Sequence, residues 1–307
     1  MLRTLLPRSL AHSPSLPVPF RRSYSSSTTT ADHDVIVHRD HSHGCTTGVV
    51  IVTLNNPRTL NALSESSGNY FRDLMHHLSA DNTIRCMILT GQGRAFSVGG
   101  DLAFLRARTR TAPQANAEIM RNFYARYLSV RQVPFPTIAA INGPAVGAGF
   151  CLALACDIRL ATMDAKMGLN FVRLGLTPGM AGTHTLPIVT NPQVAARMML
   201  TGDLVTGAEA EKLGMILKAT SPDALLPEAL ALARRIASAS PVAVRATTKT
   251  IRMSLDDGIE RALWREADTQ AHAYAAADIV EGLDAIEAKR DPIFSDFNHV
   301  PRTSETP

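Results

Sequence analysis

The stretch INGPAVGAGFCLALACD, from Ile141 to Asp157, changes character at its centre. The β-branched and alanine residues leading into it favour a strand, Asn142-Gly143 favours a turn, and the apolar run after Gly147 favours a helix. The first N–H groups of a helix have no intrahelical acceptor, and the helix dipole favours negative charge there. The stretch therefore predicts a strand-to-helix junction whose backbone amides bind an electron-rich group.

A second glycine-rich junction, AFSVGGDL from Ala95 to Leu102, precedes the first. Neither junction has the GxGxxG pattern of dinucleotide-binding proteins or the GK[ST] of a phosphate-binding loop. Small residues also permit close helix packing, and this alternative suffices for either junction alone. The pair favours function, because two converging N–H donors would form an oxyanion hole around one carbonyl oxygen.

The surrounding sequence predicts an α/β protein, since strand and helix patterns alternate before a C-terminal part that is nearly all helical. Turn residues such as Asn56-Pro57 separate the elements. The expected strands cover 35–38, 48–57, 84–91, 137–143 and 157–162, the expected helices cover 63–79, 115–131, 225–239, 241–255, 256–289 and a segment from 148, and residues 106–113 are expected to form a disordered loop.

Composition is that of a globular protein, with 307 residues, 45% hydrophobic and 19% charged. The net charge of +4 comes from the N-terminus, because Arg3, Arg8, Arg21 and Arg22 all precede the first acidic residue, Asp32. The remaining chain is balanced, so no nucleic-acid surface is indicated. No apolar run reaches the 18 residues of a membrane span, and none is expected.

The N-terminal segment is rich in arginine and serine and has no carboxylate before Asp32. These features are typical of an organelle presequence. We expect residues 1–31 to be a disordered mitochondrial presequence, with a processing site after Tyr24, and the mature protein to lie in the mitochondrial matrix. The alternative is a disordered tail without a targeting role.

The cysteines do not predict a metal site. Cys45, Cys86, Cys151 and Cys156 form no CxxC pair, and the histidines of HRDHSHG have no matching downstream cluster. We therefore expect no metal and, in a reducing compartment, four free thiols.

Six motifs in order resemble the crotonase superfamily, the enoyl-CoA hydratase and isomerase family. They are LNNPRTLNAL, AFSVGGDL, INGPAVGAGFCLALACDIRLA, GLTPGMAGTHTLP, LTGDLVTGAEAEKLGMI and EGLDAIEAKRDPIF. The resemblance implies a repeated ββα spiral core over 32–225, a helical trimerisation region over 226–297 and a flexible tail over 298–307. It also implies a homotrimer or hexamer that acts on an acyl-CoA thioester and needs no cofactor, since coenzyme A is part of the substrate.

The resemblance also implies site residues. Gly100 and Ala148 match the two oxyanion-hole donors, and Ala148 can replace the usual glycine because any residue except proline has an N–H. Arg58 is expected near the coenzyme A phosphates. The other implied substrate-binding residues are Leu60, Ala62, Val98, Gly99, Asp101, Leu102, Phe171, Pro178 and Lys289. The resemblance implies that Lys289 and Arg290 supply further positive charge from a neighbouring subunit.

The match fails at the family's acid–base groups. The two hydratase glutamates would fall at Cys151 and Phe171, and the aspartate of related isomerases would fall at Gly179. Cys151 is a weak catalytic candidate if the helix N-terminus lowers the pKa of its thiol, and is otherwise a small buried residue. Phe171 is expected to narrow the acyl pocket. The remaining acid–base candidates are Asp101, Glu118, Arg126 and His184.

These observations favour an acyl-CoA enzyme that hydrates or isomerises an enoyl-CoA in fatty-acid or related catabolism. Two alternatives stay open, because both family glutamates are missing. One is an acyl-CoA-binding or assembly subunit with impaired catalysis. The other is a different thioester reaction, such as decarboxylation or thioester hydrolysis.

Overall fold

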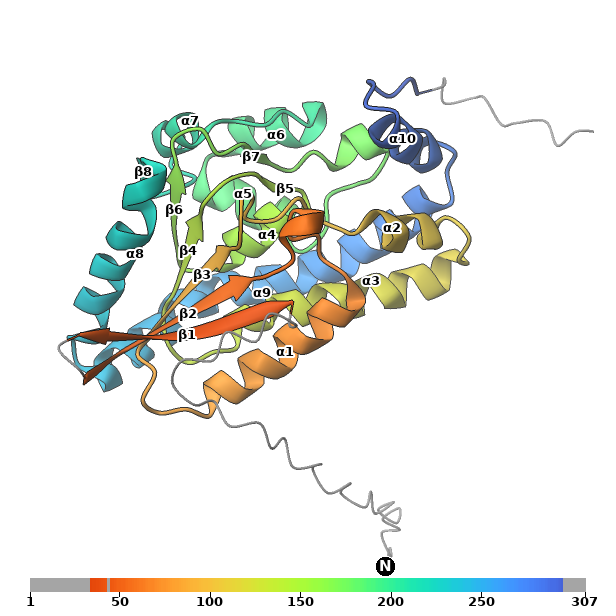
Figure 1. Cartoon of the computed structure of the whole chain (residues 1–307). Coiled ribbons are helices and arrows are strands. Elements are labelled where there is room, and N and C mark those ends of the chain that lie inside the picture. The colour runs from red at the N-terminus through yellow and green to blue at the C-terminus, as the bar shows by residue number, and fades with distance from the viewer. Residues whose placement is uncertain (1–33, 43–44, 295–307) are drawn as a thin grey trace, which may run out of the picture. The chain divides into compact units, whose positions relative to one another are not determined.

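A computed structural model describes residues 34–42 and 45–294 (Figure 1). The predicted presequence and the predicted tail from residue 298 lie outside the described residues. The main sheet has six strands in the order β1-β2-β3-β4-β6-β8. The first pair is antiparallel and every other pair is parallel. The strands are β1 (Val35–Ser42), β2 (Cys45–Leu54), β3 (Cys86–Gly91), β4 (Thr137–Ile141), β6 (Ile158–Thr162) and β8 (Lys218–Thr220).

Both faces of this sheet are covered at its centre, which explains why the central strands β3 and β4 are almost continuously apolar. Alternate residues of a strand point to opposite faces. In β4, Ile138 and Ala140 pack with the apolar side of α8 (Pro222–Ala237), while Ala139 and Ile141 join the larger core. Helix α8 therefore closes one face of the sheet, and the site helices lie on the other.

A second ladder of very short parallel strands runs beside the main sheet. It contains β5 (Ala145–Val146) and β7 (Met167–Gly168), which pair with each other. Isolated bridges extend this ladder by joining Leu63 to Gly100, Ser97 to Ala145 and Met167 to Val205. Each turn of chain thus gives one main strand, one short strand and then a helix. This arrangement confirms the predicted ββα spiral.

The helices begin where the sequence supplies caps or proline. Ser64 caps α1 through a capping box with Ser67, Asp101 caps α2, and Pro113 opens α3. The bounds are α1 (Glu65–Ser79), α2 (Leu102–Arg108), α3 (Pro113–Leu128), α4 (Ala148–Ala155), α5 (Gly182–Val189), α6 (Pro192–Thr201) and α7 (Gly207–Lys212), with 3-10 turns η1 (Pro57–Thr59), η2 (Ser129–Arg131) and η3 (Phe171–Leu174).

The expectation of a disordered loop over residues 106–113 is wrong. Helix α2 continues through Arg108, and only a short turn separates it from Pro113. Arg106 forms salt bridges with Asp284 (3.0 Å) and Glu287 (2.8 Å) of α10 (Asp278–Glu287). Side chains far along the chain therefore hold a segment whose own sequence predicts no regular structure.

In the C-terminal part, the break between two helices lies after Tyr274, before α10, and not at residues 255 and 256 as the sequence predicts. Helix α9 runs from Pro241 to Tyr274, through the predicted break at residues 255 and 256. Gly258 lies inside it, and a Cβ there would come within 2.1 Å of the His184 ring. The glycine is needed for this close packing and does not end the helix.

Arg252 anchors α9 to the core through a buried ion pair. Its guanidinium donates to both carboxylate oxygens of Asp157, at 2.8 and 2.6 Å, and to the carbonyl oxygen of Val133 at 2.6 Å. Burial acts to raise the pKa of Asp157, but these bonds hold that pKa below its ordinary value. The pair fixes the helix that supplies one wall of the site.

The predicted boundary between core and helical region, at residues 225 and 226, falls inside α8. Because α8 packs on the main sheet, it is part of the core layer in the structure. Of the described helices, none has the length and apolarity that crossing a membrane requires.

Candidate active site

The register of the short-strand ladder brings the two glycine-rich junctions together. Ser97 pairs with Ala145 in parallel, and each segment runs on for three residues to Gly100 and to Ala148. A Cβ built on Gly99 would lie 3.3 Å from the backbone nitrogen of Ala148. Two junctions distant in sequence are therefore in direct contact, as two donors that converge on one carbonyl oxygen require.

The amide of Gly100 faces away from its neighbouring strand. Leu63 donates its N–H to the carbonyl oxygen of Gly99 (2.7 Å) and accepts from the N–H of Asp101 (3.0 Å). Because residues on either side of Gly100 make both bonds, the N–H of Gly100 points to the opposite side of this segment.

The amide of Ala148 is the first of helix α4 and has no intrahelical acceptor. Gly147 precedes it with a φ of 55° and a ψ of −124°, a conformation that favours glycine. Gly149 follows, and a Cβ there would lie 2.3 Å from the carbonyl oxygen of Ser97. The flanking glycines are thus required by the backbone, whereas the middle position tolerates alanine.

One cavity adjoins both junctions, with about 640 Å³ of space including its mouth. Its walls are mainly apolar and come from the segment at 98–105 and from α3, α4, η3, α9 and α10. The lining residues are Val98, Gly99, Gly100, Leu102, Phe104, Leu105, Met120, Phe123, Tyr124, Gly147, Ala148, Asn170, Phe171, Leu174, Leu176, Gly179, Met180, Gln270, Tyr274 and Ile286.

The structure places six of the sequence-predicted residues in this wall, namely Val98, Gly99, Gly100, Leu102, Ala148 and Phe171. Asp101 is adjacent, and its carboxylate caps α2 by accepting the N–H of Phe104 at 3.0 Å. Pro178 is buried next to Gly179, which lines the cavity.

The remaining predicted substrate-binding residues lie outside the wall. Leu60 is tied to the site, because its carbonyl oxygen accepts the N–H of Val98 at 3.2 Å. Arg58 is exposed on the same turn, and Ala62 lines a smaller neighbouring pocket. Lys289 is exposed just after α10. Arg290, also expected to add positive charge, is paired with Glu281.

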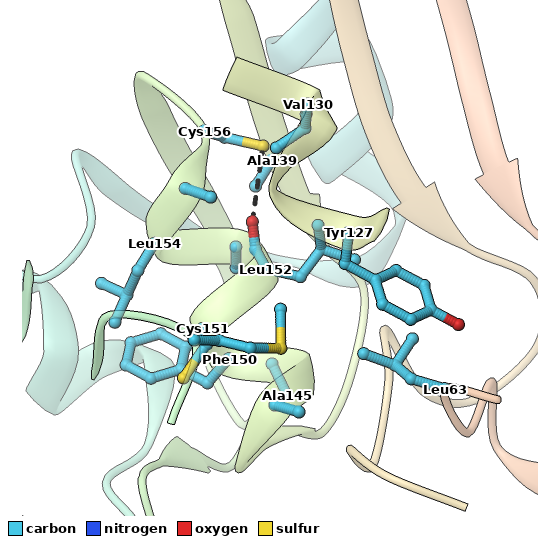
Figure 2. Close-up of a cluster of buried hydrophobic side chains, with 14 of the residues drawn as sticks. Leu63, Tyr127, Val130, Ala139, Ala145, Phe150, Cys151, Leu152, Leu154 and Cys156 are labelled. Carbon is cyan, nitrogen blue, oxygen red and sulfur yellow. Dashed lines mark hydrogen bonds between the residues drawn. The ribbon is translucent and has the colours of Figure 1, made fainter. Parts of the chain in front are cut away.

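Cys151 lies in the core behind the site, among the buried apolar side chains of Figure 2. Burial raises the pKa of its thiol well above the ordinary value, so of the two interpretations the structure supports the small buried residue. Its Sγ donates to the carbonyl oxygen of Gly179 at 3.2 Å. Cys151 is therefore a neutral, hydrogen-bonded core residue.

The other acid–base candidates also lie away from the cavity. Glu118 is exposed, Arg126 bonds Asn69 (2.8 Å) and Glu65 (3.2 Å), and His184 packs against Gly258. Within residues 34–42 and 45–294, no Asp, Glu, His, Lys or Arg side chain lines the cavity.

The polar side chains that do line it are Asn170, Tyr124, Gln270 and Tyr274. Sequence reasoning missed all four. Tyr124 lies on α3, where the spacing of the aromatic residues indicates only a face packed in the core. Gln270 and Tyr274 lie near the end of α9, after a long stretch of polar residues. No local pattern distinguishes them from structural residues.

In the described part of the chain, groups of three or more His, Cys, Asp or Glu residues that could hold a metal ion are not found. The site offers instead two backbone amides beside an apolar cavity. Such an arrangement suits a ligand with an apolar chain and a carbonyl group that accepts hydrogen bonds.

Comparison with known proteins agrees with a site for a ligand that has a carbonyl group and an apolar chain. The family model of enoyl-CoA hydratase/isomerase matches residues 44–298, and the chain belongs to that family. Similar proteins include a crotonyl-CoA hydratase of Syntrophomonas wolfei, 32% identical over 80% of this chain and 94% of the relative. They also include a 1,2-epoxyphenylacetyl-CoA isomerase of Escherichia coli, 33% identical over 81% of this chain and 95% of the relative.

A solved structure shows the same fold. An enoyl-CoA hydratase of Mycobacterium avium subsp. paratuberculosis superposes with a TM-score of 0.74 at 27% identity. The superposition covers 86% of this chain and 99% of that structure's chain.

Proposed function

We propose that the protein is an acyl-CoA-processing enzyme that hydrates or isomerises the double bond of an enoyl-CoA. The thioester carbonyl accepts hydrogen bonds from the N–H groups of Gly100 and Ala148. As an enolate forms, negative charge grows on that oxygen and both bonds strengthen. The observation that carries this proposal is the ladder register that places both amides beside one apolar cavity.

Both reaction types fall within the family, because the relatives include one named as a hydratase and one named as an isomerase. The acyl chain lies along the apolar wall, where Phe171 narrows the space. Arg58 and Lys289 bind the coenzyme A phosphates, which is supported by the exposure and positive charge of both side chains. No separate cofactor is required.

A second candidate function is an acyl-CoA-binding or assembly subunit with impaired catalysis. The specific observation in its favour is the absence of any carboxylate or imidazole among the described residues that line the cavity. General acid–base catalysis by such a group typically contributes about 10²–10⁴-fold, and this chain would lack that contribution.

Mass spectrometry separates the two candidates. The purified protein is incubated with saturated, 2-enoyl, 3-enoyl and dienoyl thioesters of coenzyme A. Addition of one water, seen as a gain in mass, supports the enzyme. A shifted double bond leaves the mass unchanged, so it is detected by a change in chromatographic retention before the mass measurement, and it supports the enzyme as well. Binding of acyl-CoA without turnover supports the second candidate, and absence of binding contradicts both.

The proposal extends to assembly and location. A homotrimer or hexamer is supported by exposed apolar side chains such as Val242, Ile251 and Met253 on α9, and light scattering of the purified protein tests it. A mitochondrial matrix location is supported by the arginine-rich, carboxylate-free segment that precedes the family match. Import of a fluorescent protein fused behind residues 1–31 tests that location.

A further inference from the structure

The inner wall of the cavity carries a cluster of three buried polar side chains, Tyr124, Gln270 and Tyr274. Gln270 and Tyr274 are four residues apart on α9, so they share one face of that helix. Tyr124 reaches the cluster from α3. All three line the same cavity as Gly100 and Ala148. The cluster is thus a second polar feature of a wall that is otherwise apolar.

The hydrogen bonds of Gln270 fix the direction of the Tyr124 proton. The Nε2 of Gln270 donates to the carbonyl oxygen of Thr177 at 2.7 Å, and a carbonyl oxygen can only accept. The Oε1 of Gln270 must therefore accept the hydroxyl proton of Tyr124, at 2.8 Å. Since a phenol has one proton, the Tyr124 oxygen is left to the cavity as an acceptor.

Gly179 makes room for this hydroxyl. A Cβ at Gly179 would lie 2.5 Å from the Tyr124 Oη and 3.0 Å from the Gln270 Nε2. The tyrosine hydroxyl therefore occupies the direction in which a side chain at 179 would project. Burial, and then the neighbouring Tyr274, raise the pKa of Tyr124 well above its ordinary value, so it stays a neutral phenol.

Tyr274 supplies the complementary group. It is 1% exposed, and its hydroxyl oxygen is buried without a hydrogen-bond partner in the described part of the chain. Buried polar groups are nearly always paired, and an unpaired one destabilises the protein unless a bound group satisfies it. Tyr274 can donate its proton, whereas Tyr124 can only accept.

We propose that this wall recognises a hydroxyl group on the acyl chain of the thioester. That hydroxyl accepts a bond from Tyr274 and donates one to Tyr124. The proposal rests on the proposed function, because it names the class of acyl-CoA that the same cavity takes. A water molecule bound to the two tyrosines is the competing occupant, and the experiment below distinguishes the two.

The test uses pairs of saturated acyl-CoA thioesters that cannot react and that differ by one hydroxyl at C4, C5 or C6. Isothermal titration measures their affinity for the full chain. We expect at least one hydroxyacyl-CoA to bind about ten-fold more tightly than its unsubstituted partner. Tyr274→Phe should remove this preference, so that the two members of each pair bind with equal affinity to within about two-fold.

Tyr127→Phe is the matched control. Tyr127 is also buried on α3, but its hydroxyl bonds Ser67 and the backbone of Ser64, away from the cavity. The preference should survive in this variant. Gln270→Met removes the acceptor of the Tyr124 proton, so the Tyr124 hydroxyl is no longer fixed as an acceptor. This variant should weaken the preference for the hydroxyacyl-CoA although Tyr274 is unchanged. Thermal unfolding of each variant verifies that it is folded.

The outcomes separate the two proposals. Equal binding of both members of every pair, as expected if water occupies the wall, overturns this inference and leaves acyl-CoA binding intact. A preference that persists in Tyr274→Phe overturns it as well. Failure of every thioester to bind the unmodified protein overturns the proposed function itself.

Discussion

Two parts of the cavity wall are built in different ways. In the first part, the amide end, the backbone amides of Gly100 and Ala148 come from neighbouring turns of the spiral, and a ladder register sets their spacing. In the second part, the tyrosine wall, Tyr124, Gln270 and Tyr274 come from helices α3 and α9, and tertiary packing sets their spacing. The amide end depends on local chain geometry, and the tyrosine wall depends on how a long C-terminal helix is held.

The difference separates the groups that bind the thioester carbonyl from the groups that distinguish one acyl chain from another. Main-chain donors fit any thioester carbonyl, so the amide end defines the class of substrate. Side chains on the tyrosine wall define which acyl group is accepted, because an unpaired buried hydroxyl penalises the wrong one. Variants that disturb the amide end or the tyrosine wall, but not both, therefore test whether the two parts have separate roles.

The largest expected effect comes from Arg252→Met, which disturbs the helix that carries the tyrosine wall. The change leaves the partly buried carboxylate of Asp157 without its charged partner and with hydrogen bonds from Thr137 alone. We expect the free energy of unfolding to fall by about 3–5 kcal/mol, measured by urea unfolding. Arg261→Ala, an exposed arginine of the same helix, is the control and should change stability by about 0.5 kcal/mol or less.

The same ion pair predicts an acid-sensitive contribution to stability. Because the folded-state pKa of Asp157 is lowered, its stabilisation is present above the ordinary carboxyl pKa and is lost as pH falls toward the folded-state value. Asp157→Asn should therefore flatten the pH dependence of unfolding on the acid side of about pH 4. An unchanged acid slope would contradict this role.

Ala148→Pro should break the amide end alone. Proline is favoured at the first position of a helix, so α4 can form while its N–H donor is removed. We expect turnover to fall by about 10²–10³-fold in steady-state kinetics. Ala148→Gly keeps the N–H and should retain most activity. Equal loss in both variants would show that the side chain, and not the amide, matters.

Gly179→Ala should disturb the tyrosine wall with the amide end intact. The added Cβ would lie 2.5 Å from the Tyr124 hydroxyl, which must move away from Gln270. We expect a loss of about 1–3 kcal/mol of stability and an altered order of preference among acyl chains. Competition binding with a panel of acyl-CoA thioesters measures this order, and an unchanged order would place Tyr124 outside recognition.

Cys151→Ala should have the smallest effect on turnover. The thiol is neutral, and it bonds a backbone carbonyl behind the cavity. We expect a stability loss of about 1 kcal/mol from the smaller side chain and the lost bond, with kcat within about three-fold. A hundred-fold loss of kcat in a folded variant would return Cys151 to the catalytic residues.

The sequence predicts the amide end because short-range signals encode it. Gly147 and Gly149 mark a bend and a close approach, and both act within a few residues of Ala148. The ββα rhythm is also local, since each turn of the spiral is a contiguous segment.

The tyrosine wall could not be predicted in this way. The bond between Tyr124 and Gln270 spans 146 residues, and no local pattern pairs them. Gly258 is a second example. Glycine weakens an isolated helix, but this glycine lies inside α9 because the His184 ring leaves no room for a side chain there. The ordering of residues 106–113 likewise depends on acidic partners in α10, such as Asp284.

The shared register of the two junctions has an evolutionary consequence. A donor that belongs to the main chain survives nearly every point mutation, since only proline deletes it. The surrounding side chains are then free to change without loss of the carbonyl-binding groups. Side chains such as Cys151 and Phe171 could therefore be exchanged while the main-chain donors persist, and new chemistry could be selected around them.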